Sequence, residues 1–114
     1  MVSLDIQTQK KTINNFLKME KLDLENLKKS LTELKNWRVD GISIKKNYKT
    51  KGFPETLGFV TAIGALCQAH DHHPDYITFG YADIEISFST HSAGGITTKD
   101  IEIAKEIDAL NFAD

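Results

Sequence analysis

The spacing of apolar residues along the chain predicts three helices. In the first, leucines recur at intervals of three and four residues from Leu24 to Leu34, and Asp23 stands where a helix N-cap is expected. The second runs over residues 53–69 and is bounded by glycine and proline at its start. The third opens at Thr97 and carries three apolar residues on one side, Ile103, Ile107 and Leu110.

The helix predicted over residues 53–69 is apolar on more than one side. One row consists of Phe59, Ile63 and Leu66, and a second row of Leu57, Val60 and Cys67. A helix that is apolar nearly all round must be buried on two sides, and in so small a chain the second side is available to another subunit. We therefore predict a homodimer or a homotetramer.

Alternating apolar and polar residues predict two β-hairpins. In the first, strands over residues 37–39 and 42–48 flank Asp40-Gly41, a dipeptide typical of a two-residue hairpin turn. In the second, residues 76–79 and 84–90 form strands joined through a turn that contains a glycine.

The last predicted strand assigns a direction to each of its side chains. Its apolar side consists of Ile84, Ile86 and Phe88, and its polar side of Glu85, Ser87 and Ser89. One face of the sheet therefore meets the core while the other faces outward. By the same parity, His91 is predicted to continue the outward side.

The order of these elements, αββαββα, predicts an α+β fold with a four-stranded antiparallel sheet covered by helices on one face. A chain of 114 residues is long enough for one such domain and too short for two. We assign residues 23–114 to this single domain. Residues 1–22 are polar and lysine-rich, and we interpret them as an N-terminal extension or a short helix.

Composition and charge exclude several classes of protein. A net charge of -2 gives no overall electrostatic case for nucleic acid binding. The chain has no apolar run of membrane-spanning length and nothing that resembles a secretory signal, so we expect a cytoplasmic protein with no membrane partner. Cys67 is the only cysteine and lies in an apolar helix, where a buried side chain is expected rather than a nucleophile.

Charge is distributed unevenly along the sequence. Residues 1–52 contain twelve Lys and Arg against six Asp and Glu, whereas residues 53–114 contain two against ten. We interpret the basic half as a solvated lysine-rich surface; the alternative is a docking face for a subunit or another partner.

All four histidines lie in or near one stretch of the chain, at His70, His72, His73 and His91. Imidazole is the unperturbed side chain that titrates near neutral pH, so such a group indicates either proton transfer or a metal site. A third interpretation is a surface corner filled with polar rings. No cysteine or carboxylate with clear ligand spacing completes a tetrahedral set, so we expect no metal and no other cofactor. Asp71 either orients a neighbouring ring or caps the corner.

The intervals between these residues form a recognisable signature. After His72-His73-Pro74, six residues lead to Tyr81, nine more to His91, and eight more to Asp100. This resembles the pterin-4a-carbinolamine dehydratase family, as does the stretch from Thr90 to Thr97. The resemblance covers about residues 22 to 109. It implies a fold of four antiparallel strands and three helices, with dimers formed through sheet edges and tetramers through helix packing.

The resemblance also implies a reaction and a set of site residues. The reaction removes water from a 4a-hydroxytetrahydropterin and gives a quinonoid dihydropterin. The implied pocket histidines are His72 and His91 for acid–base work and His73 for holding and polarising the pterin. The implied lining residues are Pro74, Thr90, Ser92 and Ala93.

Two signature positions keep other readings open. Asp100 is the terminal acid of the signature, and Thr97-x-x-Asp100 also fits a helix capping box, so we assign it a structural role with orientation of a histidine as a second function. Gln68 stands where the family usually has a charged residue or histidine. A neutral amide supplies no comparable field, which leaves open a pterin-binding module with little or no turnover. A further alternative is a dimerisation cofactor that docks on a transcription factor through the 53–69 helix.

Overall fold

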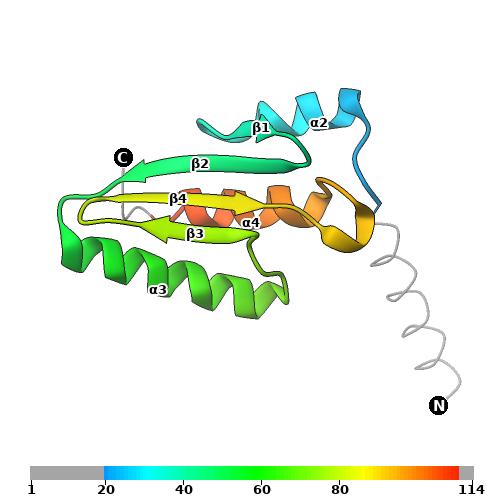
Figure 1. The fold of residues 1–114 in the computed structure, drawn as a ribbon. Helices are drawn as coiled ribbons and strands as arrows, with labels where there is room; N and C mark the ends of the chain where they lie inside the picture. Colours follow the sequence, from blue (N-terminus) through cyan, green and yellow to red (C-terminus); the bar gives the residue numbers. More distant parts are fainter. Residues whose placement is uncertain (1–19, 111–114) are drawn as a thin grey trace, which may run out of the picture.

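The computed structural model describes residues 20–110 of the 114-residue chain (Figure 1). The elements follow in the order α2 (Leu24–Leu31), β1 (Arg38–Asp40), β2 (Ser43–Lys49), α3 (Phe53–His70), β3 (Tyr76–Phe79), β4 (Asp83–Phe88), the short 3₁₀ helix η1 (His91–Ala93) and α4 (Thr98–Asp108). The predicted αββαββα order and the α+β fold class are therefore confirmed. The prediction for residues 1–22 falls almost entirely outside the described residues.

The four strands form one antiparallel sheet in the order β1-β2-β4-β3. The two sequential hairpins are thus joined through their second strands, β2 and β4. The predicted position of the first turn is wrong by one residue: Asp40 pairs with Ser43, so the loop residues are Gly41 and Ile42. Gly41 has φ of 64°, and a positive φ at the first loop position favours glycine there.

The hydrophobic core lies between the sheet and the helices. The predicted inward residues Ile84, Ile86 and Phe88 are fully buried. They contact apolar side chains from β2 and from the helices, including Ile44, Tyr48, Phe59, Ile63, Ile103 and Ile107. Helices α3 and α4 pack on each other as well as on the sheet. Burial on one face and polar side chains on the other confirm the predicted one-sided helix layer.

Two predicted helical faces need correction. In α3 the buried residues are Thr56, Phe59, Ile63 and Cys67, so Cys67 belongs to the inward row and Leu66 lies at its margin, only partly buried. Leu57, from the predicted second row, is exposed. In α2, Asp23 caps the N-terminus by accepting from the Asn26 N–H at 2.8 Å, as predicted. Leu24, however, is 67% exposed, because the helix turns its later leucines towards the core.

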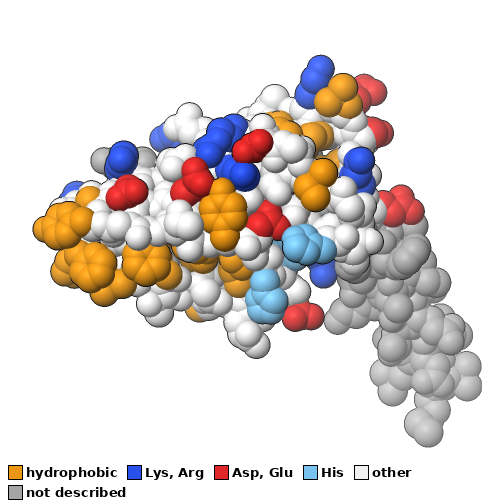
Figure 2. Space-filling model, in the orientation of Figure 1, with side chains coloured by type: hydrophobic (Ala, Val, Ile, Leu, Met, Phe, Trp, Pro, Cys, Tyr) orange, Lys and Arg blue, Asp and Glu red, His pale blue; other side chains and the backbone are white. Residues whose placement is uncertain are grey.

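Apolar side chains gather at the end of the molecule formed by the start of α3 and the β3–β4 turn (Figure 2). Phe53 and Tyr81 stack there with ring centroids 6.4 Å apart, and both are exposed. Leu57 and Phe79 are the other exposed large apolar residues of these two segments. We name these four residues the apolar end. No helix within residues 20–110 is long and apolar enough to cross a membrane.

Candidate functional site

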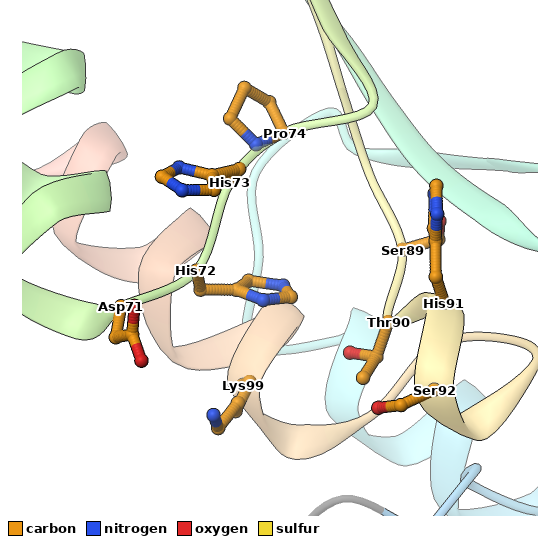
Figure 3. A pocket seen from close by; sticks show the side chains of 9 residues that line it. All are labelled: Asp71, His72, His73, Pro74, Ser89, Thr90, His91, Ser92 and Lys99. Atoms are coloured by element: carbon orange, nitrogen blue, oxygen red, sulfur yellow. The ribbon is translucent and has the colours of Figure 1, made fainter.

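A pocket of about 300 Å³ opens beyond the C-terminal end of β4 (Figure 3). It is lined by Asp71, His72, His73, Pro74, Ser89, Thr90, His91, Ser92 and Lys99. One wall comes from the segment between α3 and β3, and the other from the end of β4, η1 and the first turn of α4. The pocket therefore joins chain segments that lie near each other only in the folded protein.

His72 is positioned by the way α3 ends. Asp71 adopts a left-handed conformation with φ of 50°, one that aspartate tolerates better than most residues. The Asp71 N–H then donates to Gln68 O at 3.2 Å and the His72 N–H to Cys67 O at 3.0 Å. This pair of bonds is a Schellman motif, which stops the helix and reverses the chain. His72 consequently leaves the helix directed inward, and its residue surface is only 8% exposed.

The His72 ring is held by a carboxylate on one side and an aromatic ring on the other. Its Nε2 lies 2.5 Å from Asp100 Oδ1, and its plane stacks on Phe88 with centroids 5.8 Å apart. Because an ionised carboxylate can only accept, Nε2 is the protonated nitrogen of this pair. No hydrogen bond within residues 20–110 engages Nδ1, so that nitrogen is the one left for a ligand.

Asp100 serves the helix and the histidine with different oxygens. Oδ2 accepts from the Thr97 N–H at 2.9 Å and from the Thr90 hydroxyl at 2.9 Å. In the reciprocal bond the Thr97 side chain accepts from the backbone N–H of Asp100, which completes the capping box of α4 and confirms that prediction. Oδ1 is left for His72. Asp100 itself is fully buried, so it orients the ring from behind the pocket and does not line it.

His73 and Asp71 lie at the surface on either side of His72. Pro74 restricts His73 to extended geometry, and successive side chains of an extended segment point in opposite directions. Figure 3 shows this: the His72 ring points towards Thr90, while the His73 ring projects from the other side of the backbone. The Asp71 side chain is exposed and makes no hydrogen bond to a histidine within residues 20–110. Its clearest structural role is the helix end.

His91 lies on the opposite wall, with its side chain 80% exposed. Thr90 and Gly95 form an isolated antiparallel bridge, and Gly94 turns between them with φ of 71°. This closed loop holds η1 against the end of β4. The His91 Nε2 lies 2.9 Å from Oδ1 of Asp75, the residue just before β3. The predicted outward parity of His91 is thereby confirmed, because Ser89 bonds to the same oxygen.

The Asp75 carboxylate accepts hydrogen bonds from three serines as well as from His91. Ser43 and Ser87 each donate to Oδ2 at 2.8 Å, and Ser89 donates to Oδ1 at 2.5 Å. Burial alone would raise the pKa of Asp75, but the bonds from Ser89, Ser87, Ser43 and His91 outweigh it and lower that pKa below its ordinary value. Asp75 is therefore ionised at neutral pH.

The structure brings most of the predicted site residues together. Of the predicted lining residues, Pro74, Thr90 and Ser92 line the pocket, whereas Ala93 does not. Sequence reasoning missed Ser89 and Lys99 in the lining and Asp75 behind it. The shared outward parity of Ser87, Ser89 and His91 is the signal from which a common polar partner on the outer face could have been inferred.

The remaining candidates lie elsewhere. His70, the fourth histidine, pairs with Glu106 of α4. Within residues 20–110 no three His, Cys, Asp or Glu side chains are grouped so that they could hold a metal ion. Gln68 is exposed on α3 and does not line the pocket. Tyr76 donates to Glu85 Oε1 at 2.6 Å on the outer sheet face, which is a packing role.

Comparison with known proteins identifies the family of the chain. Residues 20–110 match the family described as "Pterin 4 alpha carbinolamine dehydratase". A protein of Sulfolobus acidocaldarius named "Putative pterin-4-alpha-carbinolamine dehydratase" is 39% identical over 90 residues, spanning 79% of this chain and 98% of the relative. A protein of Aquifex aeolicus with the same name is 38% identical over 92 residues, spanning 81% of this chain and 92% of the relative.

Solved structures share the fold. A crystal structure described as a transcriptional coactivator/pterin dehydratase from Brucella melitensis matches with a TM-score of 0.76 and 29% identity, spanning 83% of this chain and 100% of that one. A pterin dehydratase-like protein described as a RuBisCO assembly factor in the alpha-carboxysome matches with a TM-score of 0.56 and 22% identity, spanning 68% of this chain and 89% of that one, which is a likeness of fold alone. The match over residues 20–110 and the identities of the curated relatives establish that this chain belongs to the pterin-4-alpha-carbinolamine dehydratase family.

Proposed function

We propose that the chain removes water from a 4a-hydroxytetrahydropterin in the cytoplasm, giving a quinonoid dihydropterin. The observation that supports this most is the pairing of two imidazoles with carboxylates on opposite walls of one pocket. Breaking the bond from carbon 4a to its hydroxyl requires a proton delivered to the departing oxygen. A second proton must leave a ring nitrogen of the pterin, so one group has to donate and another has to accept.

His72 and His91 are the groups we assign to these two proton transfers. Each presents one ring nitrogen to a carboxylate and keeps the other available, so each ring can exchange a proton with a ligand without losing its orientation. Imidazole suits this work near neutral pH. A pocket of about 300 Å³ is at the lower end of the range usual for small-molecule sites.

The other lining residues are assigned to substrate binding. His73 is exposed and lines the pocket beside Pro74, and we assign it to holding a polar edge of the pterin ring. Ser92 lies on the far wall, and Thr90 lines that wall beside it while its hydroxyl bonds Asp100 and Thr97 behind the pocket. Ala93, which does not line the pocket, would act through the backbone of the η1 turn.

The direct test is to follow dehydration of freshly generated 4a-hydroxytetrahydropterin by absorbance, with and without the protein. Acceleration that saturates with substrate supports the proposal. Saturable binding of the pterin without acceleration would instead identify a binding module that has lost turnover. Absence of both binding and acceleration would reject the pocket as a pterin site.

We also propose that the chain forms a homodimer or a homotetramer, or binds another protein, through the outward side of α3. The apolar end exposes Phe53, Leu57, Phe79 and Tyr81, a larger apolar group than scattered single residues would give. Sedimentation at micromolar concentration should show an oligomer that Leu57→Glu dissociates. Ile63→Glu is unsuitable for this purpose because Ile63 is fully buried in the core. A monomeric wild type would reject self-association.

A further inference from the structure

The Asp75 carboxylate and its three serine donors form a hydrogen-bonded cluster on the outer face of the sheet. The donors come from two different strands, Ser43 from β2 and Ser87 with Ser89 from β4 and its end. Ser87 is 1% exposed and Ser89 3% exposed, which is unusual for polar side chains on a face that carries no helices. We name Asp75, Ser43, Ser87 and Ser89 the outer cluster.

The backbone fixes Asp75 as firmly as the serines do. Its N–H donates to Ser87 O at 2.7 Å, which continues the β3–β4 ladder one residue before β3 begins. Pro74 precedes Asp75, and its fixed φ restricts the backbone conformation of the chain there. One main-chain bond therefore fixes the Asp75 backbone, and three hydroxyls fix its carboxylate. The position of the carboxylate does not depend on His91.

His91 has no comparable support of its own. Its side chain is 80% exposed, and its side-chain hydrogen bond within residues 20–110 is the one from Nε2 to Asp75 Oδ1. Without a partner, an exposed neutral imidazole samples both tautomers and several rotamers. An ionised carboxylate accepts but cannot donate, so this bond requires the proton to be on Nε2.

We infer that Asp75 is a positioning residue for His91: the outer cluster holds its carboxylate so that His91 keeps the Nε2–H tautomer and offers the lone pair of Nδ1 to the substrate. This inference rests on the proposed function for its catalytic consequence. With His91 as the accepting group, a ring N–H bond of the pterin breaks and an Nδ1–H bond forms, while the proton for the departing hydroxyl comes from His72 in its doubly protonated form. The imidazolium so produced lies beside an ionised carboxylate and later returns the proton to water.

The inference predicts a tautomer that can be measured without turnover. Long-range ¹H–¹⁵N correlation of the labelled protein should show the His91 ring, assigned by its loss in His91→Gln, protonated on Nε2 and unprotonated on Nδ1 when neutral. In Asp75→Asn the amide can present its NH₂ to the ring, so the Nε2–H form should cease to dominate. A wild type dominated by the Nδ1–H form would overturn the inference, as would an unchanged tautomer in Asp75→Asn.

Turnover gives a second, independent result. Asp75→Asn should lower kcat about 10–100-fold, as expected when the outer partner of a working imidazole is altered, with KM changed less than about twofold. The matched control is Asp40→Asn, which removes a carboxylate that bonds Lys45 near the β1–β2 turn and does not touch His91. It should leave the tautomer and kcat unchanged. Equal loss in both variants would mean that surface charge, not positioning, matters.

A third variant covers the case in which Asp75→Asn does not fold. Ser89→Ala removes the hydroxyl that shares Asp75 Oδ1 with His91 and leaves the carboxylate in place. The carboxylate then keeps two of its serine donors, and the Nε2–H tautomer should persist with a kcat loss of less than about tenfold. If the wild type shows the Nε2–H tautomer but no dehydration, the proposed function fails and the positioning role stands. If dehydration is fast and Asp75→Asn changes neither measurement, the positioning role fails alone.

Discussion

Two carboxylate–histidine pairs flank the pocket, one on each face of the sheet. The inner pair, His72 and Asp100, lies on the helix-covered face, where the ring stacks on Phe88 and the carboxylate is fully buried. The outer pair, His91 and Asp75, lies on the open face, with the ring exposed to solvent. One histidine–carboxylate pair is therefore buried and the histidine of the other pair is exposed to solvent, on opposite sides of one pocket.

The difference between the pairs lies in what else each carboxylate does. Asp100 also caps α4, so the orientation of His72 is part of the fold. Within residues 20–110 the Asp75 carboxylate bonds serines and His91 and caps no helix, so the orientation of His91 is added to a sheet that is already formed. From this contrast we expect changes in the inner pair to affect stability and activity together. Changes in the outer pair should affect mainly activity.

The largest effect is expected from removing either ring. His72→Ala and His91→Ala should each lower kcat by roughly 10²–10⁴-fold, the range for a positioned acid or base. Only His72→Ala should also destabilise the fold, by about 1–3 kcal/mol, because it leaves a buried carboxylate oxygen without its partner. Steady-state kinetics and urea unfolding measure both. His70→Ala is the control, since His70 pairs with Glu106 away from the pocket and its loss should leave kcat unchanged. Normal turnover in either pocket variant would remove that histidine from the mechanism.

Removing the carboxylates should separate the pairs by stability. Asp100→Ala should cost on the order of 3 kcal/mol, because it removes half of the capping box and leaves the His72 ring N–H and the Thr97 backbone N–H without their buried partner. Asp75→Ala should cost about 1 kcal/mol, since water can reach the serine hydroxyls once the side chain is gone. Urea unfolding at pH 7 gives both values. Equal losses of unfolding free energy would contradict the expectation that the buried inner pair stabilises the fold more than the outer pair.

The pH dependence of stability should contain a contribution from the outer pair. The pKa of Asp75 is lowered on folding from its ordinary value of 3.8, so its stabilising contribution is complete above about pH 4. It is lost as the pH falls through the lower, folded-state pKa. Unfolding free energy measured between pH 2 and pH 7 should therefore fall less steeply below pH 4 in Asp75→Asn than in the wild type. If the wild type and Asp75→Asn give parallel curves, Asp75 has the same pKa in the folded and the unfolded protein.

The smallest effect is expected at Asp71, a carboxylate next to His72 that bonds neither ring. Its left-handed conformation is one that glycine adopts without strain, so Asp71→Gly should raise stability by about 0.5–1 kcal/mol. The kcat should change less than about threefold. Thermal unfolding and the dehydration assay test this. A larger loss of kcat would mean that Asp71 belongs to the proton-transfer machinery with the two pairs.

Much of the fold could be predicted because its signals are local. The leucine spacing of α2, the alternation of β4 and the Thr97–Asp100 capping box each need only a few neighbouring residues. The first turn was misplaced because its alternative registers differ by two residues in pairing. A shift of two leaves every side chain on the same face, so alternation could not distinguish them. The prediction placed Cys67 on the wrong row of α3. The buried row also contains Thr56, a polar residue that a search for apolar positions does not count.

The site was predictable only where one stretch of sequence carried it. The three pocket histidines and Asp100 stand at the intervals of the family signature, so the resemblance pointed to them although His72 and Asp100 are 28 residues apart. The outer cluster gives no such signal, because Ser43 and Asp75 are 32 residues apart and meet only after the strands pair. Lys99 was missed for a similar reason: it lies in the first turn of α4 and meets the residues that follow α3 only in the folded chain.

The shared use of Asp100 links a helix end to the chemistry of the pocket in time as well as in space. Helix ends fray by local opening events that are far cheaper than global unfolding. When the Thr97 N–H separates from Asp100, the carboxylate that holds His72 is released from the same anchor. The hydrogen-exchange rate of the Thr97 amide therefore reports how often the capping box opens, and a change of that rate in His72→Ala would show that the opening is coupled to the buried imidazole.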